Sequence, residues 1–255
     1  MNTSSSHPGV SSVLLTTISL VTFLSTSNAQ GRVSGGRIAI VVDERLSVLR
    51  DSPDLSGKLL RRIGRGRAVS ITGQNRSRDG VLFYSVKISR RTRGWLQKEA
   101  VIVPRRLGDD ERLLRLINTS ADFDCVARAR IFLDAFPNSP LRPRVLLLFG
   151  DAAEQAAVRL SHDASRRLNA QEMRANEAPV FSYSLNYGGL DRYNRQGVRF
   201  AFDRDQRKFH YEGASWREIV RRYPHSPEAA QARSRLAAIV AKIRYSMGPQ
   251  ASRLQ

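Results

Sequence analysis

One thiol and three imidazoles are the side chains that could support nucleophilic catalysis. Cys125 is the only cysteine of the 255 residues, and Asp124 precedes it. A thiolate nucleophile requires a base held within reach. Beyond residue 29 the candidate bases are His162, His210 and His225, each isolated in the sequence. We therefore expect Cys125 to be a buried helix residue, His162 to lie on a solvated helix face and His225 to be exposed in a turn.

The acidic and glycine-rich patterns add no catalytic or metal-binding site. Asp109-Asp110-Glu111 is the longest acidic run, and carboxylates in such a run favour the start of a helix, whose N-terminal end is positive. The sequence contains no glycine-rich phosphate loop and no zinc-ligand spacing. A single cysteine also excludes an intramolecular disulfide. We expect no metal, no cofactor and no reaction catalysed by this chain.

Basic residues dominate the charge of the chain. The 42 Lys or Arg outnumber 23 Asp or Glu, which gives a formal net charge of +19 at pH 7, and all but five of the basic residues are arginine. Arginine forms bidentate contacts with carboxylates and phosphates, and so large a positive field attracts polyanions over a distance set by salt. The alternative is that a GC-rich genome enriches arginine codons and that these side chains are mostly solvated.

The first 29 residues have the features of a cleaved secretory signal. Residues 13–24 are an apolar run interrupted only by Thr and Ser, too short to span a bilayer, and Ser27-Asn28-Ala29 supplies the small residues that signal peptidase needs. No Lys or Arg precedes the apolar run, so a disordered N-terminus is the alternative. Gln30 would begin the mature chain, and a lipid-anchored cysteine is not expected there. We expect a secreted or periplasmic protein without an integral membrane span.

Residues 37–104 have the pattern of a small all-β domain. Strands are expected at 37–42, 46–50, 68–72, 82–88 and 94–103. Turn residues separate them, and these lie at Asp51-Ser52-Pro53-Asp54, Gly64-Arg65-Gly66 and Arg78-Asp79-Gly80, the last being a hairpin signal. The segment holds 15 Lys or Arg against 6 Asp or Glu, which predicts a basic surface.

The order of motifs in this segment resembles that of bacterial SH3 (SH3b) domains. The family pattern is matched by Leu46 to Pro53, by Ile63 before Gly66-Arg67-Ala68-Val69, by Phe83-Tyr84-Ser85-Val86 and by Arg93-Gly94-Trp95-Leu96. Two features depart from the family pattern. The arginine directly follows the valine in that pattern, whereas here Leu49 stands between Val48 and Arg50, and the hairpin at residues 90–93 is more basic than usual. The resemblance implies an SH3-like β-barrel that binds a peptide or glycan, often of the cell wall, and it does not imply catalysis.

Five residues of this segment are candidates for contact with a ligand. Arginine and aromatic side chains together can form a cleft for an anionic ligand. Packing in the core is an alternative role for the two aromatic residues among them. The candidate contact residues are Arg50, Tyr84, Arg91, Arg93 and Trp95.

From Asp109 the apolar period changes from 2 to about 3.6, which predicts helices as far as residue 245. Ser120 is expected to cap a helix that ends at Pro137, and Ser139-Pro140 is expected to begin the next one. The apolar stripe of the first of these helices consists of Ala129, Phe132, Leu133 and Phe136.

The same connection recurs near the C-terminus. Phe136-Pro137-Asn138-Ser139-Pro140 and Tyr223-Pro224-His225-Ser226-Pro227 are two copies of one helix-turn-helix joint, 87 residues apart. They resemble the tetratricopeptide-like repeats of bacterial envelope proteins, such as the outer-membrane β-barrel assembly lipoprotein and the periplasmic coordinator of the Tol-Pal system. Such repeats run about 34 residues, so the spacing requires an inserted segment. The resemblance implies protein binding through a helical groove.

The inserted segment, residues 176–213, is rich in aromatic and basic residues. Alternation at residues 198–202 and 209–211 predicts a short hairpin with its turn at residues 203–207. Two roles are open for the insertion. It could seal the gap between helices that are not adjacent in sequence, or it could form a stacking and phosphate-contacting surface.

Together these patterns predict an exported, non-enzymatic binding or scaffold protein of multidomain fold. A signal peptide (1–29) precedes an SH3b-like barrel (37–104) that binds peptidoglycan or another anionic envelope polymer, and a tetratricopeptide-like helical domain (109–245) then binds protein. One alternative is a divergent NlpC-type cell-wall cysteine peptidase using Cys125, although Val126-Ala127 replaces the Ser-Gly that follows the Asp-Cys of that family. The other is a nucleic-acid-binding protein, which an export signal argues against.

Overall fold

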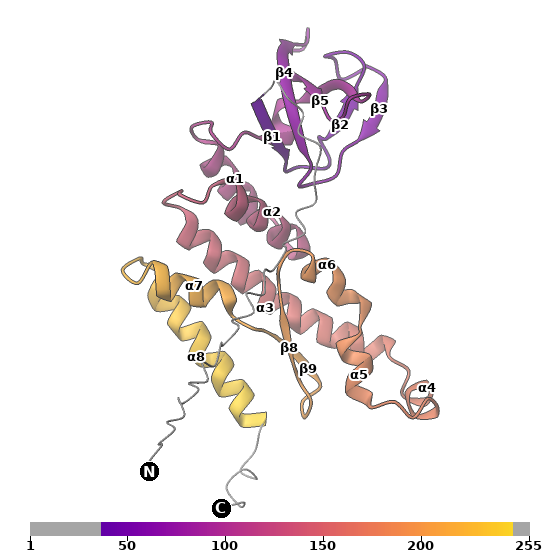
Figure 1. Ribbon diagram of the computed structural model, residues 1–255, viewed down its shortest axis with the longest axis vertical. Coiled ribbons are helices and arrows are strands. Elements are labelled where there is room, and N and C mark those ends of the chain that lie inside the picture. The colour runs from indigo at the N-terminus through magenta and orange to yellow at the C-terminus, as the bar shows by residue number, and fades with distance from the viewer. Residues whose placement is uncertain (1–36, 247–255) are drawn as a thin grey trace, which may run out of the picture. The chain divides into compact units, whose positions relative to one another are not determined.

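A computed structural model describes residues 37–246 of the chain (Figure 1). The expected signal peptide, residues 1–29, lies outside the described residues. An antiparallel sheet comes first along the chain, and helices with one short hairpin follow it, so the fold is mixed α and β. None of the described helices is both long and apolar enough to cross a bilayer.

The sheet has seven strands, all paired antiparallel. They are β1 (Arg37–Val41), β2 (Val48–Arg50), β3 (Leu59–Arg62), β4 (Ala68–Arg76), β5 (Leu82–Lys87), β6 (Arg93–Gln97) and β7 (Val101–Ile102). Their order across the sheet is β3-β2-β6-β5-β4-β1-β7. A single 3-10 turn, η1 (Lys98–Ala100), separates β6 from β7 and returns the chain to pair with β1.

Most of the expected strands are confirmed, with two differences. The run expected at 94–103 is divided by η1 into β6 and β7. Strand β3 was not expected, because its four residues, Leu59-Leu60-Arg61-Arg62, are all exposed and therefore show no alternation of apolar and polar side chains. The expected hairpin at Asp79-Gly80 is confirmed, and Gly80 takes the positive φ of 80° that the turn requires.

The inner face of the sheet encloses an apolar core. Side chains alternate between the two faces of a strand, so every second residue of β5 and β6 points inward. The buried residues of this core are Ala39, Val41, Leu49, Ile63, Val69, Ile71, Tyr84, Val86, Leu96, Ala100, Val101 and Val103.

Three helices follow the sheet, α1 (Asp109–Asn118), α2 (Asp122–Ala135) and α3 (Arg142–Arg167). The expected apolar stripe of α2 is buried, and α2 ends just before Pro137 as predicted. Two expected helix starts are wrong. Ser120 does not cap α2, because its hydroxyl donates to the carbonyl of Leu116 and Ala121 occupies the cap position. Pro140 precedes α3, and Pro143 is the proline of its first turn.

The remaining elements are α4 (Ala170–Ala175), α5 (Val180–Leu185), η2 (Gly188–Leu190), α6 (Asp191–Asn194), β8 (Phe200–Asp203), β9 (Lys208–Tyr211), α7 (Ala214–Arg222) and α8 (Glu228–Ser246). The hairpin expected within the insertion is confirmed as β8 and β9, in which Phe202 lies opposite Phe209. Its turn is held by Asp203, whose Oδ1 accepts the N–H groups of Asp205 at 2.9 Å and Gln206 at 3.0 Å.

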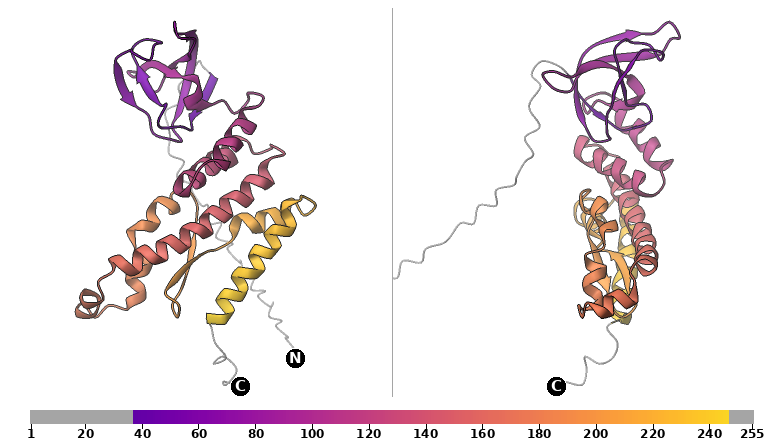
Figure 2. Two further views of the ribbon diagram at one scale, coloured as in Figure 1. Left: turned by 180° about the vertical axis from the view of Figure 1, so that it is seen from behind. Right: turned by 90° about the vertical axis from the view of Figure 1, so that its right-hand side faces the viewer.

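Helix α3 is the centre of the helical part and contacts α2, α7 and β9 (Figure 2). Small residues allow the close approach. A Cβ at Gly150 would lie 2.3 Å from Nε1 of Trp216, so the indole of α7 rests directly on the backbone of α3. The hairpin is also fixed to α3, because the N–H of Phe209 donates to Oγ of Ser161 at 2.8 Å and the N–H of Tyr211 donates to Glu154 at 2.8 Å. At least this part of the insertion packs in the helical core.

The sheet and the first helices share an apolar core. Val42 and Ile102, at the ends of β1 and β7, belong to the same buried cluster as Leu113 of α1 and Val126 of α2. The buried carboxylate of Asp109 continues the contact, since its Oδ2 accepts the N–H of Val103 at 2.7 Å. Asp109, in the first turn of α1, therefore provides the hydrogen-bond acceptor that the N–H of Val103 lacks in the sheet.

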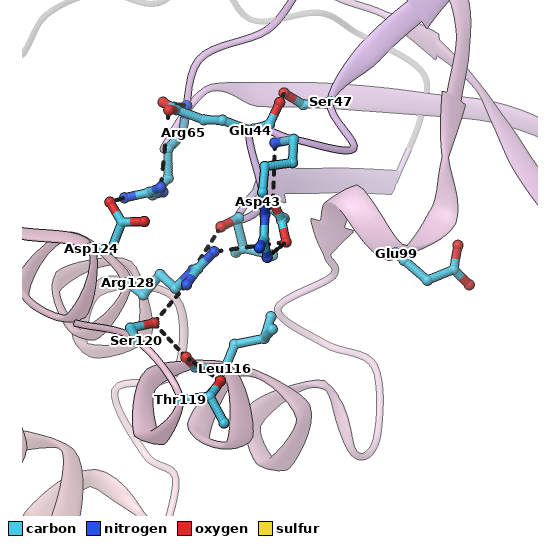
Figure 3. A network of polar contacts seen from close by, with 12 residues as sticks. Asp43, Glu44, Ser47, Arg65, Glu99, Leu116, Thr119, Ser120, Asp124 and Arg128 are labelled. Carbon is cyan, nitrogen blue, oxygen red and sulfur yellow. Dashed lines mark hydrogen bonds and ion pairs between the residues drawn. The ribbon is translucent and has the colours of Figure 1, made fainter. Parts of the chain in front are cut away.

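A buried arginine of α2 completes the junction, which Figure 3 shows from close by. Nε of Arg128 donates to the carbonyl of Val42 at 3.1 Å, and Nη1 donates to Oγ of Ser120 at 2.6 Å. Nη2 lies 3.8 Å from Oδ2 of Asp43, and both side chains are 6 % exposed. Arg45 holds the other side of the Asp43 carboxylate, with Nη2 at 2.7 Å from Oδ2.

A second ion pair spans the junction. Nη1 of Arg65, in the turn before β4, donates to Oδ1 of Asp124 at 2.8 Å. The hydrogen bonds from Arg45 lower the pKa of Asp43, and the hydrogen bond from Arg65 lowers the pKa of Asp124. Both carboxyl groups are thus held ionised against the partial desolvation that raises their pKa values. Removing Asp43 from its buried pair with Arg128 costs about 3–5 kcal/mol, because the guanidinium charge is left uncompensated. The pair of Arg65 with Asp124 contributes less, because the Asp124 side chain is 51 % exposed.

The depressed pKa values predict a loss of stability in acid. A carboxyl group whose folded pKa lies below its unfolded value stabilises the fold above the unfolded pKa of about 3.9, and this contribution is lost as the pH falls through the folded pKa. Urea unfolding measured from pH 7 to pH 3 should show a steep decline for the native sequence. Asp43→Asn should be less stable at pH 7 and should decline less in acid.

Asp79→Asn is the matched control, since Asp79 lies in an exposed turn and its side chain has no hydrogen bond or ion pair among the described residues. Its acid decline should equal that of the native sequence. An equal acid decline for Asp43→Asn would show that the junction carboxylate does not contribute.

Candidate functional site

The outer face of the sheet brings three of the five candidate contact residues together. Arg50 at the end of β2 lies opposite Trp95 of β6 in the ladder, and Trp95 lies opposite Ser85 of β5. Arg93, two residues before Trp95 on the same strand, lies opposite Lys87. Residues two apart on a strand share a face, so these five side chains lie on one surface. We call Arg50, Ser85, Lys87, Arg93 and Trp95 the outer face.

Burial agrees with this assignment for the residues next to Arg50 and Trp95, although Phe83, on the same side of β5 as Ser85 and Lys87, is 1 % exposed. Leu49 and Leu96, the neighbours of Arg50 and Trp95, are fully buried in the inner core. Trp95 is half-buried, and Arg93 is exposed. An indole flanked by cationic side chains, with its neighbours fixed in a core, is a rigid platform on which the apolar faces of sugars or peptides can pack.

The other two candidate residues do not lie on the outer face. Tyr84 lies opposite Leu96 and is 6 % exposed in the inner core, where its hydroxyl accepts a hydrogen bond from Nη1 of Arg106 at 2.6 Å. The alternation of β5 therefore assigns Tyr84 to packing. Arg91 is exposed in the turn between β5 and β6, two residues before Arg93, and is not part of a strand.

Arg50 has a structural contact as well. Its Nη1 donates to the carbonyl of Gly57 at 2.6 Å, which ties the loop between β2 and β3 to the sheet. The same loop is closed by Asp51, whose Oδ1 accepts the N–H of Lys58 at 2.9 Å. A guanidinium group has five N–H donors, so this contact leaves others free for a ligand.

No acidic residue interrupts the positive charge of the seven-stranded sheet's strands. The seven strands contain neither Asp nor Glu, and the acidic residues of this part of the chain lie in its connections. The basic residues of the strands are Arg37, Arg50, Arg61, Arg62, Arg76, Lys87 and Arg93. An anion that approaches the outer face thus meets positive side chains without a competing carboxylate on the same strands.

Strand β3 extends the outer face, and the sequence did not reveal this. Leu59 lies opposite Arg50 and is 48 % exposed, which adds an apolar residue beside the guanidinium. The register between β2 and β3 shifts between Leu49 and Arg50, which a run of four exposed residues does not reveal. Lys87 was likewise missed, because only its pairing with Arg93 places it beside Trp95.

The thiol of Cys125 lies apart from this face, in the helical core. Cys125 is 8 % exposed, and burial raises the pKa of its thiol, which opposes formation of a thiolate nucleophile. His162 is exposed on α3 and His225 is exposed before α8, as expected. His210 is buried on β9, with Nδ1 3.4 Å from Oε1 of Glu154. Among residues 37–246, no three His, Cys, Asp or Glu side chains are grouped so that they could hold a metal ion.

The chain matches no protein-family model, no curated protein sequence and no solved structure.

Close packing at Gly94 should be essential to the outer face. A Cβ at this position would lie 2.6 Å from the carbonyl oxygen of Arg50 and 2.9 Å from Cγ of Leu49, so β2 and β6 could not pair at their present distance. Gly94→Ala should lower the free energy of unfolding by about 1–3 kcal/mol, as overpacking does. Gly73→Ala on β4 is the control, because its Cβ would make an ordinary contact of 3.7 Å, and it should change stability by less than about 0.5 kcal/mol. Equal effects of both changes, measured by urea unfolding, would contradict the close approach.

Burial of Cys125 should make its thiol unreactive in the folded protein. Ellman's reagent at pH 8 should label it slowly under native conditions and rapidly after unfolding in urea. Rapid labelling of the native protein would show an accessible thiolate and would support a nucleophilic role for Cys125.

Proposed function

We propose that this chain is an exported, non-enzymatic binding protein of the cell envelope, whose sheet binds peptidoglycan or another anionic envelope polymer and whose helical part binds protein. The observation that carries the proposal is the outer face, where a half-buried Trp95 lies among Arg50, Lys87 and Arg93 on strands without acidic residues.

An SH3b-type barrel is the finer fold that we propose for the sheet. The resemblance is supported by the way its motifs fall on neighbouring strands. The motif at residues 83–86 lies on β5, the motif at 93–96 lies on β6, and the segment 46–53 includes β2. These three strands are consecutive in the sheet, in the order β2-β6-β5.

A tetratricopeptide-like arrangement is the finer fold that we propose for the helices. The two sequence joints connect α2 to α3 and α7 to α8, and the helices of each pair contact each other. Helix α3 also contacts α7, so the two pairs pack together although the insertion separates them in sequence. Such packing of helix pairs is the basis of protein binding by helical repeats.

The chemistry of the outer face suits a polymer with carboxylates or phosphates and apolar sugar faces. Guanidinium groups bind carboxylate and phosphate oxygens in pairs, while the indole offers a flat apolar surface. Exposed charges attract the polymer at low salt and are screened within about 8 Å at physiological ionic strength. Binding should therefore weaken as salt rises.

Export and the lack of catalysis are parts of the same proposal. The apolar run at 13–24 and the small residues at 27–29 support cleavage by signal peptidase and a location outside the cytoplasm. The buried Cys125 with its raised pKa supports a role without covalent chemistry. The buried Cys125 argues against the peptidase alternative, and the expected export argues against the nucleic-acid alternative.

The test is co-sedimentation of the purified protein with peptidoglycan sacculi. We expect the native protein to pellet at low salt and to remain in solution at high salt. The double variant Lys87→Gln/Arg93→Gln should bind about thirtyfold more weakly, since each of the two surface cations is worth about 1 kcal/mol against an anionic polymer. Trp95→Ala should weaken binding further at a salt concentration where charge is screened.

The matched control is Arg144→Gln/Arg221→Gln, which removes the same charge from exposed positions on α3 and α7. It should bind as the native protein does. Equal weakening of both double variants would show that only net charge matters, and no pelleting of the native protein at low salt would refute the proposal.

A further inference from the structure

We propose that a cavity between α3 and the η2–α6 segment binds a small zwitterionic ligand, an amino acid or short peptide that carries both an ammonium and a carboxylate group. The cavity has a volume of about 370 Å³, which lies within the usual size of small-molecule sites. It is lined by Leu160, Asp163 and Arg167 of α3 and by residues 187–195. Helices α3 and α6 lie side by side in Figures 1 and 2.

Four charged side chains at this cavity do not neutralise one another. Asp163 and Arg167 belong to α3, Asp191 to α6, and Arg195 follows α6 directly. Within residues 37–246 none of these four side chains makes a hydrogen bond or an ion pair. Arg167, Asp191 and Arg195 are exposed and Asp163 is half-buried, so two carboxylates and two guanidinium groups are open to a ligand that replaces the water around them.

Arg192 supplies a fifth charge, and its contacts hold it in place at one wall of the cavity. The guanidinium carbon of Arg192 lies 5.1 Å from the ring centre of Phe123 and 4.9 Å from that of Tyr193, and Nη2 donates to the hydroxyl of Tyr193 at 3.2 Å. Tyr193 is itself buried, with its ring edge against Phe123 at 5.3 Å. This wall therefore presents a positive charge that does not need to be ordered by the ligand.

The floor of the cavity is apolar and closely packed. A Cβ at Gly189 would lie 2.4 Å from Cε1 of Tyr187 and 3.1 Å from Cδ2 of Leu160, so only glycine allows the phenol ring to lie against this backbone. The buried Leu160 and the half-buried Tyr187 thus form a surface for the hydrocarbon part of a ligand.

The mixture of charges selects the ligand. A simple anion such as phosphate would be attracted by Arg167 and Arg195 but repelled by Asp163 and Asp191, and a simple cation would meet the reverse. A ligand with both charges can satisfy both sets at once, while ligands with one charge leave the other set unpaired. This argument is independent of the outer face of the sheet and of the function proposed for it.

Isothermal titration of the purified protein can test the proposal with matched probes. Alanine and dialanine carry both charges, N-acetylalanine carries only the carboxylate, and alaninamide carries only the ammonium group. We expect saturable binding of alanine or dialanine, and binding at least tenfold weaker for both blocked compounds and for inorganic phosphate. Tighter binding of alanine would identify the ligand as a free amino acid, and tighter binding of dialanine would identify it as a peptide.

Variants distinguish recognition of charge from a structural effect. Arg167→Gln should weaken binding of the zwitterion about tenfold and leave the weak binding of alaninamide unchanged. Asp191→Asn should also weaken binding of the zwitterion about tenfold, but it should leave the weak binding of N-acetylalanine unchanged. Gly189→Ala should weaken all probes, because it displaces Tyr187. Asp205→Asn, in the exposed turn of the hairpin, is the control and should bind as the native protein does.

Two outcomes would overturn the proposal. Phosphate or N-acetylalanine binding as tightly as the zwitterions would make this a simple anion site, and no saturable heat from either zwitterion at millimolar concentration would remove the site. Melting temperatures of Arg167→Gln, Asp191→Asn and Asp205→Asn should stay at native values, and every variant should bind sacculi as the native protein does, which separates this proposal from the function of the sheet.

Discussion

The buried guanidinium group of Arg128 is the constraint on which the arrangement of the described residues depends. A charge so far from water is tolerated only if its N–H groups and its charge are satisfied, and here the carbonyl of Val42, the hydroxyl of Ser120 and the carboxylate of Asp43 do so. These partners come from the end of β1 and from the start of α2. Separating the sheet from the helices would break the contacts of Arg128 with Val42 and Asp43 and would leave Asp43 paired with Arg45 alone.

The elements of this fold were largely predictable, and the contacts between them were not. The strand at β5 and the helical stripe of α2 produce local patterns in the sequence, and both elements were predicted. Ser120 shows the limit. A serine before an acidic first turn predicts a helix cap, but here the hydroxyl is taken by Leu116 and by Arg128. The contact with Arg128, eight residues further along the chain, thus replaces the expected cap. No pattern in the sequence predicts this contact.

The candidate site divides in the same way. Arg50, Arg93 and Trp95 were identified from residue type and prove to share a face, whereas Tyr84 was placed among them by its position in a motif. The period of 2 in a strand separates Tyr84 from Trp95 only when the register between β5 and β6 is known. Lys87 joins the face for the same reason, because a pairing across strands is a relation between distant residues and leaves no trace in either segment alone.

The excess of arginine over lysine has a structural cause beside the two explanations that the composition allows. Arg112 and Arg142, like Arg128, each donate to a backbone carbonyl and lie within salt-bridge distance of a carboxylate. A planar fork of five N–H groups can serve both acceptors at once, which the single ammonium group of lysine does less well. Some of the arginines therefore stabilise contacts between helices and strands inside the molecule. The charge that can act on a partner is that of side chains such as Arg93, which are exposed and lie on strands without carboxylates, so the distribution of the charge carries more functional information than its total.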